Sequence, residues 1–299
     1  MKNMQAAESA AAAGVTAVDS HAHVFERGLP LAARRRHAPD FDALLDDYLG
    51  LLDTCGISHG VLVQPSFLGT DNRYFLDAIA RHPRRLRGVA MIDPGMPLAD
   101  LRALQAQGNT GVRVNLVGIE IPDFASPDWQ ALLGHMRSLD LHLEIHRDAC
   151  DLPRLLDALL PSGCRLVIDH LGRPEPALGI ADPGFAALLR AADSGRVWVK
   201  LSAAYRSARS PRVDAGARTA ALAAEDAGSA RSTVAALLAA FGPERLVWGS
   251  DWPHTQHRDF IDYAASRALL DEWVPDASQR RRILADTPAE LFGFCRAAP

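Results

Sequence analysis

Histidine and aspartate side chains lie at the ends of several short apolar segments of this sequence. VDSHAH carries His21 and His23, LHLEIH ends at His146, VIDHLG carries His170, and LVWGSDWPH reaches Asp251. A carboxylate held near imidazoles can take a proton from water, so this set indicates a hydrolase in which Asp251 acts as general base. Taken alone, Asp251 would be more typical of a residue that caps the next helix, and only the histidines favour the catalytic interpretation.

Eight β-rich segments must position these residues, and amphipathic helical segments such as 41–56, 151–163 and 183–195 separate them. The predicted strands are 15–19, 60–64, 86–92, 111–115, 141–146, 165–169, 196–202 and 245–250. This strict alternation predicts an α/β protein with a parallel sheet, and eight units favour a closed (β/α)8 TIM barrel. No GxGxxG follows the first strand, which argues against a nucleotide-binding open sheet. In such a barrel the C-terminal ends of the strands converge at the active site.

Side-chain alternation within the predicted strands supports a closed barrel. In LHLEIH, apolar residues alternate with His142, Glu144 and His146, and in VRVN, valines alternate with Arg113 and Asn115. One set of each strand faces the helices and the other faces the lumen. The lumen is therefore expected to be more polar than packing alone requires.

The predicted organisation is one domain over residues 15–299, preceded by an Ala-rich, disordered tail at 1–14. The segment 208–230 is small, polar and long for a loop between strand and helix, and we interpret it as an insertion over the barrel mouth. A lid and simple disorder are equal alternatives for it. From Ala277 onward, one or two helices are expected to close the domain.

Composition excludes several functional classes. The net charge is -4 with scattered basic residues, and the short run RRRH at 34–37 is typical of a solvated loop, so no nucleic-acid partner is indicated. No window approaches the roughly 18 apolar residues of a membrane span. The four cysteines lie far apart without a CxxC pair, which fits a reducing cytoplasm. The number of associating chains is left open, a homo-oligomer included.

Six motifs resemble the amidohydrolase superfamily (amidohydrolase family 2), and within it the 2-pyrone-4,6-dicarboxylate lactonase group. They are VDSHAHVF, VLVQPSFLGTDNR, GVRVN, VIDHLGRP, VWVKLSAAYR and LVWGSDWPH, in this order along the chain. The resemblance implies a distorted (β/α)8 barrel that hydrolyses a lactone. His21, His23 and His170 would polarise the ring carbonyl, while Asp251 would activate the attacking water and then protonate the leaving oxygen.

The resemblance leaves two alternatives for a metal. In the wider superfamily, one or two divalent ions occupy a site whose positions are filled here by His21, His23, His146, His170 and Asp251. These ligands suit zinc or manganese. The pyrone-dicarboxylate lactonases, however, are understood to work without metal. Arg113 stands where a bridging carboxylated lysine would end the fourth strand, so we expect either no ion or one.

Several residues are candidates for substrate binding. Arg113 at the barrel mouth could hold a carboxylate bidentately, with an ion pair to Glu144 as the alternative. The family pattern and the loop after the first strand add further candidates, namely His37, Ser66, Arg73, His146, Arg173, Tyr205 and Arg206. The TDNR segment around Arg73 could equally provide turn and cap chemistry, with Asp71 or Asn72 starting a helix.

Two differences from the family pattern bear on the substrate. Residues 36–39 replace a Tyr-Thr-Pro segment, and the loop after GVRVN has Glu120 and Asp123 where the pyrone enzymes have a second arginine. A monoanionic lactone, a sugar-acid lactone or a sulfo-lactone fits the remaining cations.

The expected function is therefore hydrolysis of an anionic lactone by a cytoplasmic enzyme. One alternative is a metal-dependent decarboxylase of aromatic acids, which shares the H-x-H pair and the GSDWPH-like end. Another, from a different class, is a catalytically silent barrel that binds a small carboxylate.

Overall fold

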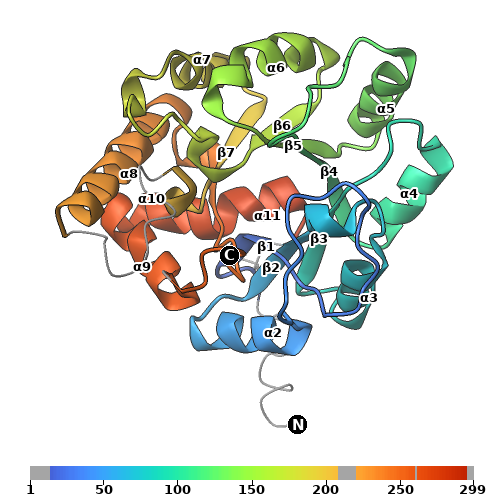
Figure 1. The fold of residues 1–299 in the computed structure, drawn as a ribbon, viewed down its shortest axis with the longest axis horizontal. Coiled ribbons are helices and arrows are strands. Elements are labelled where there is room, and N and C mark those ends of the chain that lie inside the picture. Colours follow the sequence, from blue (N-terminus) through green and yellow to red (C-terminus); the bar gives the residue numbers. More distant parts are fainter. Residues whose placement is uncertain (1–13, 208–219, 260, 295–299) are drawn as a thin grey trace.

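Eight parallel strands form one sheet in chain order in the computed structural model, which describes residues 14–207, 220–259 and 261–294 (Figure 1). The strands are β1 (Val18–Ala22), β2 (His59–Val63), β3 (Leu86–Ala90), β4 (Asn109–Asn115), β5 (His142–His146), β6 (Arg165–Ile168), β7 (Val197–Leu201) and β8 (Leu246–Trp248). Backbone hydrogen bonds from Asp251 N to His21 O and from His23 N to Trp252 O, each 2.8 Å, join the end of β8 to β1. The predicted (β/α)8 barrel is confirmed.

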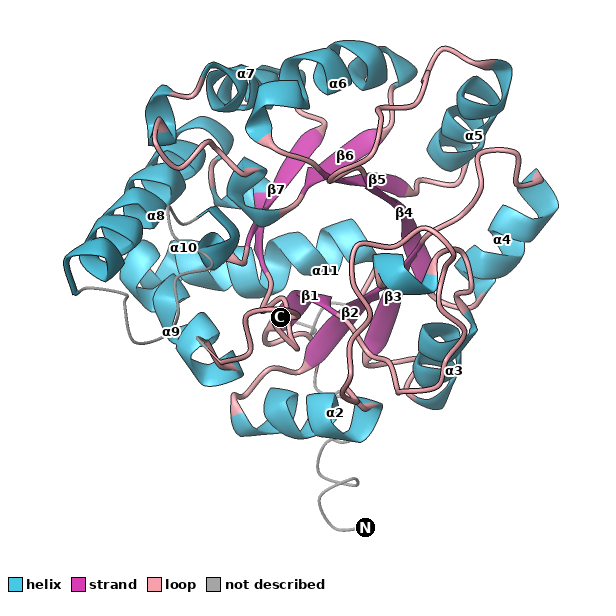
Figure 2. Ribbon diagram, viewed as in Figure 1, coloured by secondary structure: helices cyan, strands magenta, loops and turns pink. Residues whose placement is uncertain are grey.

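Helices surround the strands (Figure 2). They are α2 (Leu45–Thr54), α3 (Arg73–Arg81), α4 (Leu98–Ala106), α5 (Pro127–Ser138), α6 (Leu152–Leu159), α7 (Pro183–Ala191), α8 (Ala220–Phe241), α9 (Tyr263–Trp273), α10 (Ala277–Arg281) and α11 (Thr287–Phe292). The buried leucines of α6 recur at helical spacing and explain why this segment is a helix packed on the sheet. The predicted segments 151–163 and 183–195 end in 3-10 turns, which Gly163 and Gly195 terminate in the left-handed conformation.

An apolar layer fills the N-terminal end of the barrel. Val61, Val89, Val167 and Val247 point into the lumen and pack against Phe292 of α11, which is fully buried. Figure 1 shows α11 lying across the ring of strands. The helices expected after Ala277 are therefore present, and the last of them closes the end of the barrel opposite the strand tips.

The prediction of an insertion at 208–230 is wrong for residues 220–230. Residues 220–230 form the first half of α8, which packs on α7 and α9. This stretch is rich in alanine, which is the strongest helix former. Its small residues are also typical of loops, which is why the sequence pattern indicates a loop. Residues 208–219, and residues 1–13 of the predicted tail, lie outside the described part of the chain. Among the described helices, none has the length and apolar character needed to cross a membrane.

Candidate active site

A cavity opens at the C-terminal ends of the strands and collects most of the predicted site residues. Those that line it are His23, His37, Ser66, Arg113, His146, His170, Arg206 and Asp251. His21 lies beside them, fully buried, with its ring centroid 5.0 Å from that of His23 and 4.8 Å from that of His170. The barrel therefore brings side chains from seven of the eight strands and their following loops to one place.

Close contact between β8 and β1 positions Asp251. A Cβ atom on Gly249 would lie 2.7 Å from His21 Cβ, so only glycine allows the two backbones to approach this far. Asp251 itself has φ 60°, a left-handed conformation that is uncommon for a residue other than glycine. Such backbone strain is typical of functional sites, and here it turns the carboxylate into the cavity.

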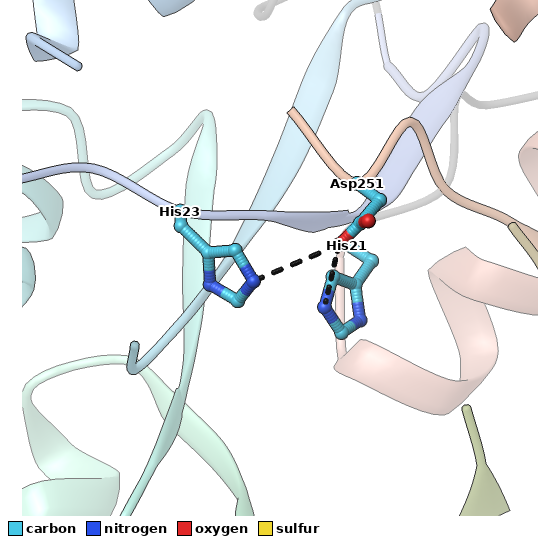
Figure 3. A group of neighbouring side chains, drawn as sticks. All are labelled: His21, His23 and Asp251. Atoms are coloured by element: carbon cyan, nitrogen blue, oxygen red, sulfur yellow. Dashed lines mark ion pairs between the residues drawn. The ribbon is translucent and has the colours of Figure 1, made fainter. Parts of the chain in front are cut away.

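The two oxygens of Asp251 have different surroundings. Oδ2 accepts hydrogen bonds from the Tyr205 hydroxyl at 2.5 Å and from Arg206 Nε at 2.8 Å. Oδ1 receives no hydrogen bond from any described residue and faces His21 Nε2 at 3.7 Å and His23 Nε2 at 3.8 Å (Figure 3). Burial acts to raise the pKa of this carboxyl, but the Arg206 guanidinium and the neighbouring imidazoles together outweigh it and hold the pKa well below its usual range. Asp251 is thus an ionised acid with one oxygen ready to accept a proton.

His23 presents a lone pair to the cavity. Its Nδ1 lies 2.7 Å from the Val63 carbonyl oxygen, which can only accept, so Nδ1 carries the proton. Burial and the charge of Arg113 lower the pKa of His23 to about 3, which keeps the ring neutral with a bare Nε2 toward Asp251. The polarising role that the resemblance implied for His23 requires an N–H donor, and this tautomer supplies an acceptor instead.

His146 has the opposite tautomer, and His21 has two charged neighbours at Nδ1. Arg113 Nη2 donates to His146 Nδ1 at 3.2 Å, so the proton of that neutral ring is on Nε2. His21 Nδ1 lies 3.1 Å from Lys200 Nζ, a donor, and 3.3 Å from Asp169 Oδ1, an acceptor. The Nε2 atoms of both rings have no hydrogen-bond partner among the described residues. Burial and Lys200 lower the pKa of His21 to about 3, so its ring is neutral.

His170 follows β6 with φ 54°, and its Nδ1 lies 2.9 Å from Ser202 Oγ of the next strand loop. Its ring centroid is 4.6 Å from that of His146. The His170 ring therefore lies near those of both His21 and His146. The sequence predicts His170 at the end of the sixth strand, and it follows β6 in the structure.

A buried network of four charges lies below the histidines and gives Arg113 a different role from the favoured one. Arg113 Nε lies 3.5 Å from Glu144 Oε1, and Arg113 Nη2 lies 3.4 Å from Asp169 Oδ2. Lys200 Nζ pairs with the same Glu144. The ion pair was the alternative for Arg113, and it is the arrangement present. Arg113 still lines the cavity, but its charge is matched by buried acids.

Tyr205, Arg73 and Arg173 were expected to bind substrate, and the structure places them elsewhere. The Tyr205 hydroxyl contacts Asp251 rather than the cavity. The side chain of Arg73 is 80% exposed and pairs with Asp71, which fits the alternative of turn and cap chemistry. Arg173 pairs with Asp148 at 2.7 Å and is not among the residues that line the cavity. A motif fixes the position of such a residue in the chain but not the direction of a long side chain.

Three residues that contribute to the site were not identified as such from the sequence. Lys200 lies within the VWVKLSAAYR motif and Asp169 within VIDHLGRP, but the motifs assign neither residue a role. Arg36, in a basic run interpreted as a solvated loop, lines the cavity together with His37. The signal for Arg36 was its place in the loop that follows the H-x-H strand.

The ligand atoms are compatible with one divalent ion. One atom from each of His21, His23 and Asp251 lies within 4.8 Å of the others, and a second group comprises His21, Asp169 and His170. Asp251 Oδ1 has no hydrogen-bond partner among the described residues, and His23 Nε2 carries a lone pair, as a zinc ligand must. His21 could join them with its proton on Nδ1, where Asp169 Oδ1 at 3.3 Å can accept it. His146, expected as a further ligand, belongs to neither group.

Comparison with known proteins identifies what the chain is similar to. A model of the amidohydrolase family matches residues 18–294. The chain is 33% identical to a 4-sulfomuconolactone hydrolase of Rhizobium radiobacter, over 92% of this chain and 89% of that protein. It is 32% identical to a 2-pyrone-4,6-dicarboxylate hydrolase of Comamonas testosteroni, over 92% and 90%.

Solved structures show the same likeness. A structure from Pseudomonas putida, described as a candidate 2-pyrone-4,6-dicarboxylic acid hydrolase, is 46% identical with a TM-score of 0.85 and covers 94% of this chain and 98% of that one. A 2,6-dihydroxybenzoate decarboxylase from Rhizobium is 15% identical with a TM-score of 0.63, which shows a shared fold alone.

Proposed function

The chain belongs to the amidohydrolase family, and we propose that it hydrolyses the ring ester of an anionic lactone with Asp251 as general base. One observation carries this proposal. Asp251 Oδ2 is held by Tyr205 and Arg206, whereas Oδ1 is without a hydrogen bond from the described residues and faces two imidazoles. A fixed, ionised carboxylate with one available oxygen is the arrangement that deprotonation of water needs.

The tautomers suggest the remaining roles. A water molecule between Asp251 Oδ1 and His23 Nε2 would donate one hydrogen bond to each and turn an oxygen lone pair toward the substrate. With Lys200 donating to its Nδ1, His21 would present Nε2–H to the carbonyl oxygen and stabilise the negative charge that develops there as water attacks. Asp251 would take one proton of the water and pass it to the ring oxygen when the C–O bond breaks. The new carboxylic acid would lose the other proton to solvent, so the products are a carboxylate, a hydroxyl group and one released proton.

His23, Asp251 and His21 with its proton on Nδ1 would hold a divalent ion if one is bound. It would supply Lewis-acid polarisation of the carbonyl oxygen or of water. The proton transfers described above are those of the chain's own residues without an ion, because a lone pair that binds a metal cannot also accept a proton.

The nature of the substrate rests on charge and on the relatives. Arg36, Arg113 and Arg206 line the cavity, and a cationic cavity favours an anionic ligand. Relatives named for sulfomuconolactone and pyrone-dicarboxylate hydrolysis support a lactone that carries an acidic group. The likeness to a decarboxylase is confined to the fold and supports no decarboxylation. We propose a cytoplasmic location, which the free thiols of Cys55, Cys150 and Cys164 support.

The decisive experiment follows proton release from a panel of acidic lactones with metal-stripped and with zinc-loaded protein. Asp251→Asn should lower kcat by about 10²- to 10⁴-fold, because the amide cannot accept a proton from water. Asp71→Asn, which removes a half-buried carboxylate outside the cavity, serves as the matched control. Equal rates for Asp251→Asn and the unaltered protein would remove Asp251 from the mechanism. Binding without turnover by the unaltered protein would favour the silent carboxylate-binding barrel.

A further inference from the structure

The cations of the cavity differ in whether an acid already neutralises them. Arg113 lies within 3.5 Å of Glu144 and of Asp169, and Arg206 lies 2.8 Å from Asp251. Both guanidinium groups are nearly buried, with their charges satisfied by the protein. Neither can give a substrate anion a full, unshared positive charge.

Arg36 is different. Its side chain is exposed and lines the cavity, and no hydrogen bond or ion pair joins its guanidinium to a residue in the described part of the chain. The acid that acts on Arg36 electrostatically is Asp148, and that carboxylate is already paired with Arg173 at 2.7 Å. Partial burial, then Arg113 and Arg206, lower the pKa of Arg36, yet a guanidinium remains protonated at neutral pH. Among the described residues, Arg36 is therefore a positive charge of the cavity without a counter-ion of its own.

The loop holds Arg36 in place without using its charge. Ala32 N donates to the Phe67 carbonyl oxygen at 2.8 Å, and the His37 ring packs edge-on against Phe67 with centroids 5.2 Å apart. These contacts fix the backbone on either side of Arg36. A Cβ atom on Gly118 would lie 3.5 Å from Arg36 Cδ, so the arginine stem reaches the loop that follows β4. Arg36 thus extends between two loops at the cavity mouth.

From this geometry we propose that Arg36 determines substrate specificity by binding the acidic group of the lactone, a carboxylate or a sulfonate outside the reacting ester. This inference rests on the proposed lactone hydrolysis and names the substrate class of that site more closely. Because Arg36 is one cation without a counter-ion among the described residues, it can balance one acidic group of the substrate. We therefore expect the enzyme to prefer a lactone with a single negative charge to a lactone with two. A guanidinium suits either acid, since both present oxygens to its planar fork.

Arg36→Met tests the proposal in kinetics. The neutral side chain keeps the stem but loses the charge-assisted hydrogen bonds, so KM for a carboxylated lactone should rise about tenfold or more with kcat little changed. KM for the methyl ester of the same lactone should stay as it is. Arg35→Met is the matched control, because Arg35 is exposed, donates only to the Ala32 carbonyl oxygen and does not line the cavity.

A binding measurement separates this inference from the proposed function. A 2-pyridone carboxylate has a ring of similar shape that the enzyme cannot open, and its Kd by titration calorimetry should also weaken about tenfold in Arg36→Met. An equal rise in KM for acid and ester, or an unchanged Kd for the pyridone carboxylate, would overturn the role of Arg36 even in an active lactonase. Unaltered protein that binds this anion through Arg36 but hydrolyses no lactone would overturn the proposed function and leave the anion site standing.

Discussion

Fixed neighbours decide which nitrogen carries the proton in two histidines of the cavity. The Val63 carbonyl puts the proton of His23 on Nδ1, whereas Arg113 leaves that of His146 on Nε2. The cavity therefore has an acceptor imidazole and a donor imidazole without either ring being charged. One neutral histidine can therefore accept a hydrogen bond from water while another donates a hydrogen bond to the ester.

At the same scale, Arg206 sets the pH range of the base. Its charge helps to hold the pKa of Asp251 well below the usual value, so the base stays ionised and active into acid solution. Arg206→Met should raise that pKa, and the acid limb of kcat/KM against pH should move to higher pH with it. The profile is measured on metal-stripped protein. Arg231→Met, at an exposed pair with Glu272, is the control, and an unmoved acid limb in Arg206→Met would contradict the prediction.

At the scale of elements, the junction between β1 and β8 positions the catalytic acid. Asp19 of β1 accepts hydrogen bonds from Ser250 N at 2.8 Å, Ser250 Oγ at 2.6 Å and the Tyr263 hydroxyl at 3.1 Å. A buried carboxylate thus ties the end of β8 and the start of α9 to the first strand. Asp251 follows Ser250 directly, so its direction depends on this junction.

Asp19→Ala should therefore cost about 2–4 kcal/mol of unfolding free energy, because it leaves buried donors of Ser250 and Tyr263 unpaired. Urea denaturation measures the loss. Asp46→Ala removes an acid that is 80% exposed, and there the change should stay within about 1 kcal/mol. Similar small losses for both variants would show that the junction is held by other contacts.

The whole barrel is layered along its axis. Valines and Phe292 fill the N-terminal end, the network of Arg113, Glu144, Asp169 and Lys200 occupies the middle, and the imidazoles lie at the open end. The middle layer joins β4, β5, β7 and the end of β6, and it supports His21 and His146 from below. The same four charged residues therefore contribute to the stability of the barrel and contact the Nδ1 atoms of His21 and His146.

Lys200→Met should destabilise the protein by about 3–5 kcal/mol, since it leaves the fully buried Glu144 and Asp169 with too little positive charge. The double variant Lys200→Met/Glu144→Gln should recover part of that loss, because the unmatched charge is removed as well. Thermal or urea unfolding of both variants gives the comparison. A double variant less stable than Lys200→Met would show that charge matching is not what the network provides.

The sequence by itself determined the barrel and which strand ends carry chemistry. Local periodicity specifies strands and helices, and the two-residue spacing of His21 and His23 places both on one face of a strand. The fold class and the position of Asp251 at the end of β8 could be inferred in this way, and the family followed from the resemblance of six motifs. The Ala-rich start of α8 was predicted to be part of an insertion, because small and polar residues occur in both helices and loops.

Only the tertiary structure decided the partners of the long charged side chains. Arg113 pairs with acids on β5 and after β6, Arg73 turns to solvent, and Arg36 reaches the cavity from a loop that looked solvated. Each outcome depends on neighbours that are far away in the chain and brought close by closure of the barrel. The proton positions on His23 and His146 follow from those neighbours, because a hydrogen bond to one ring nitrogen fixes the state of the other.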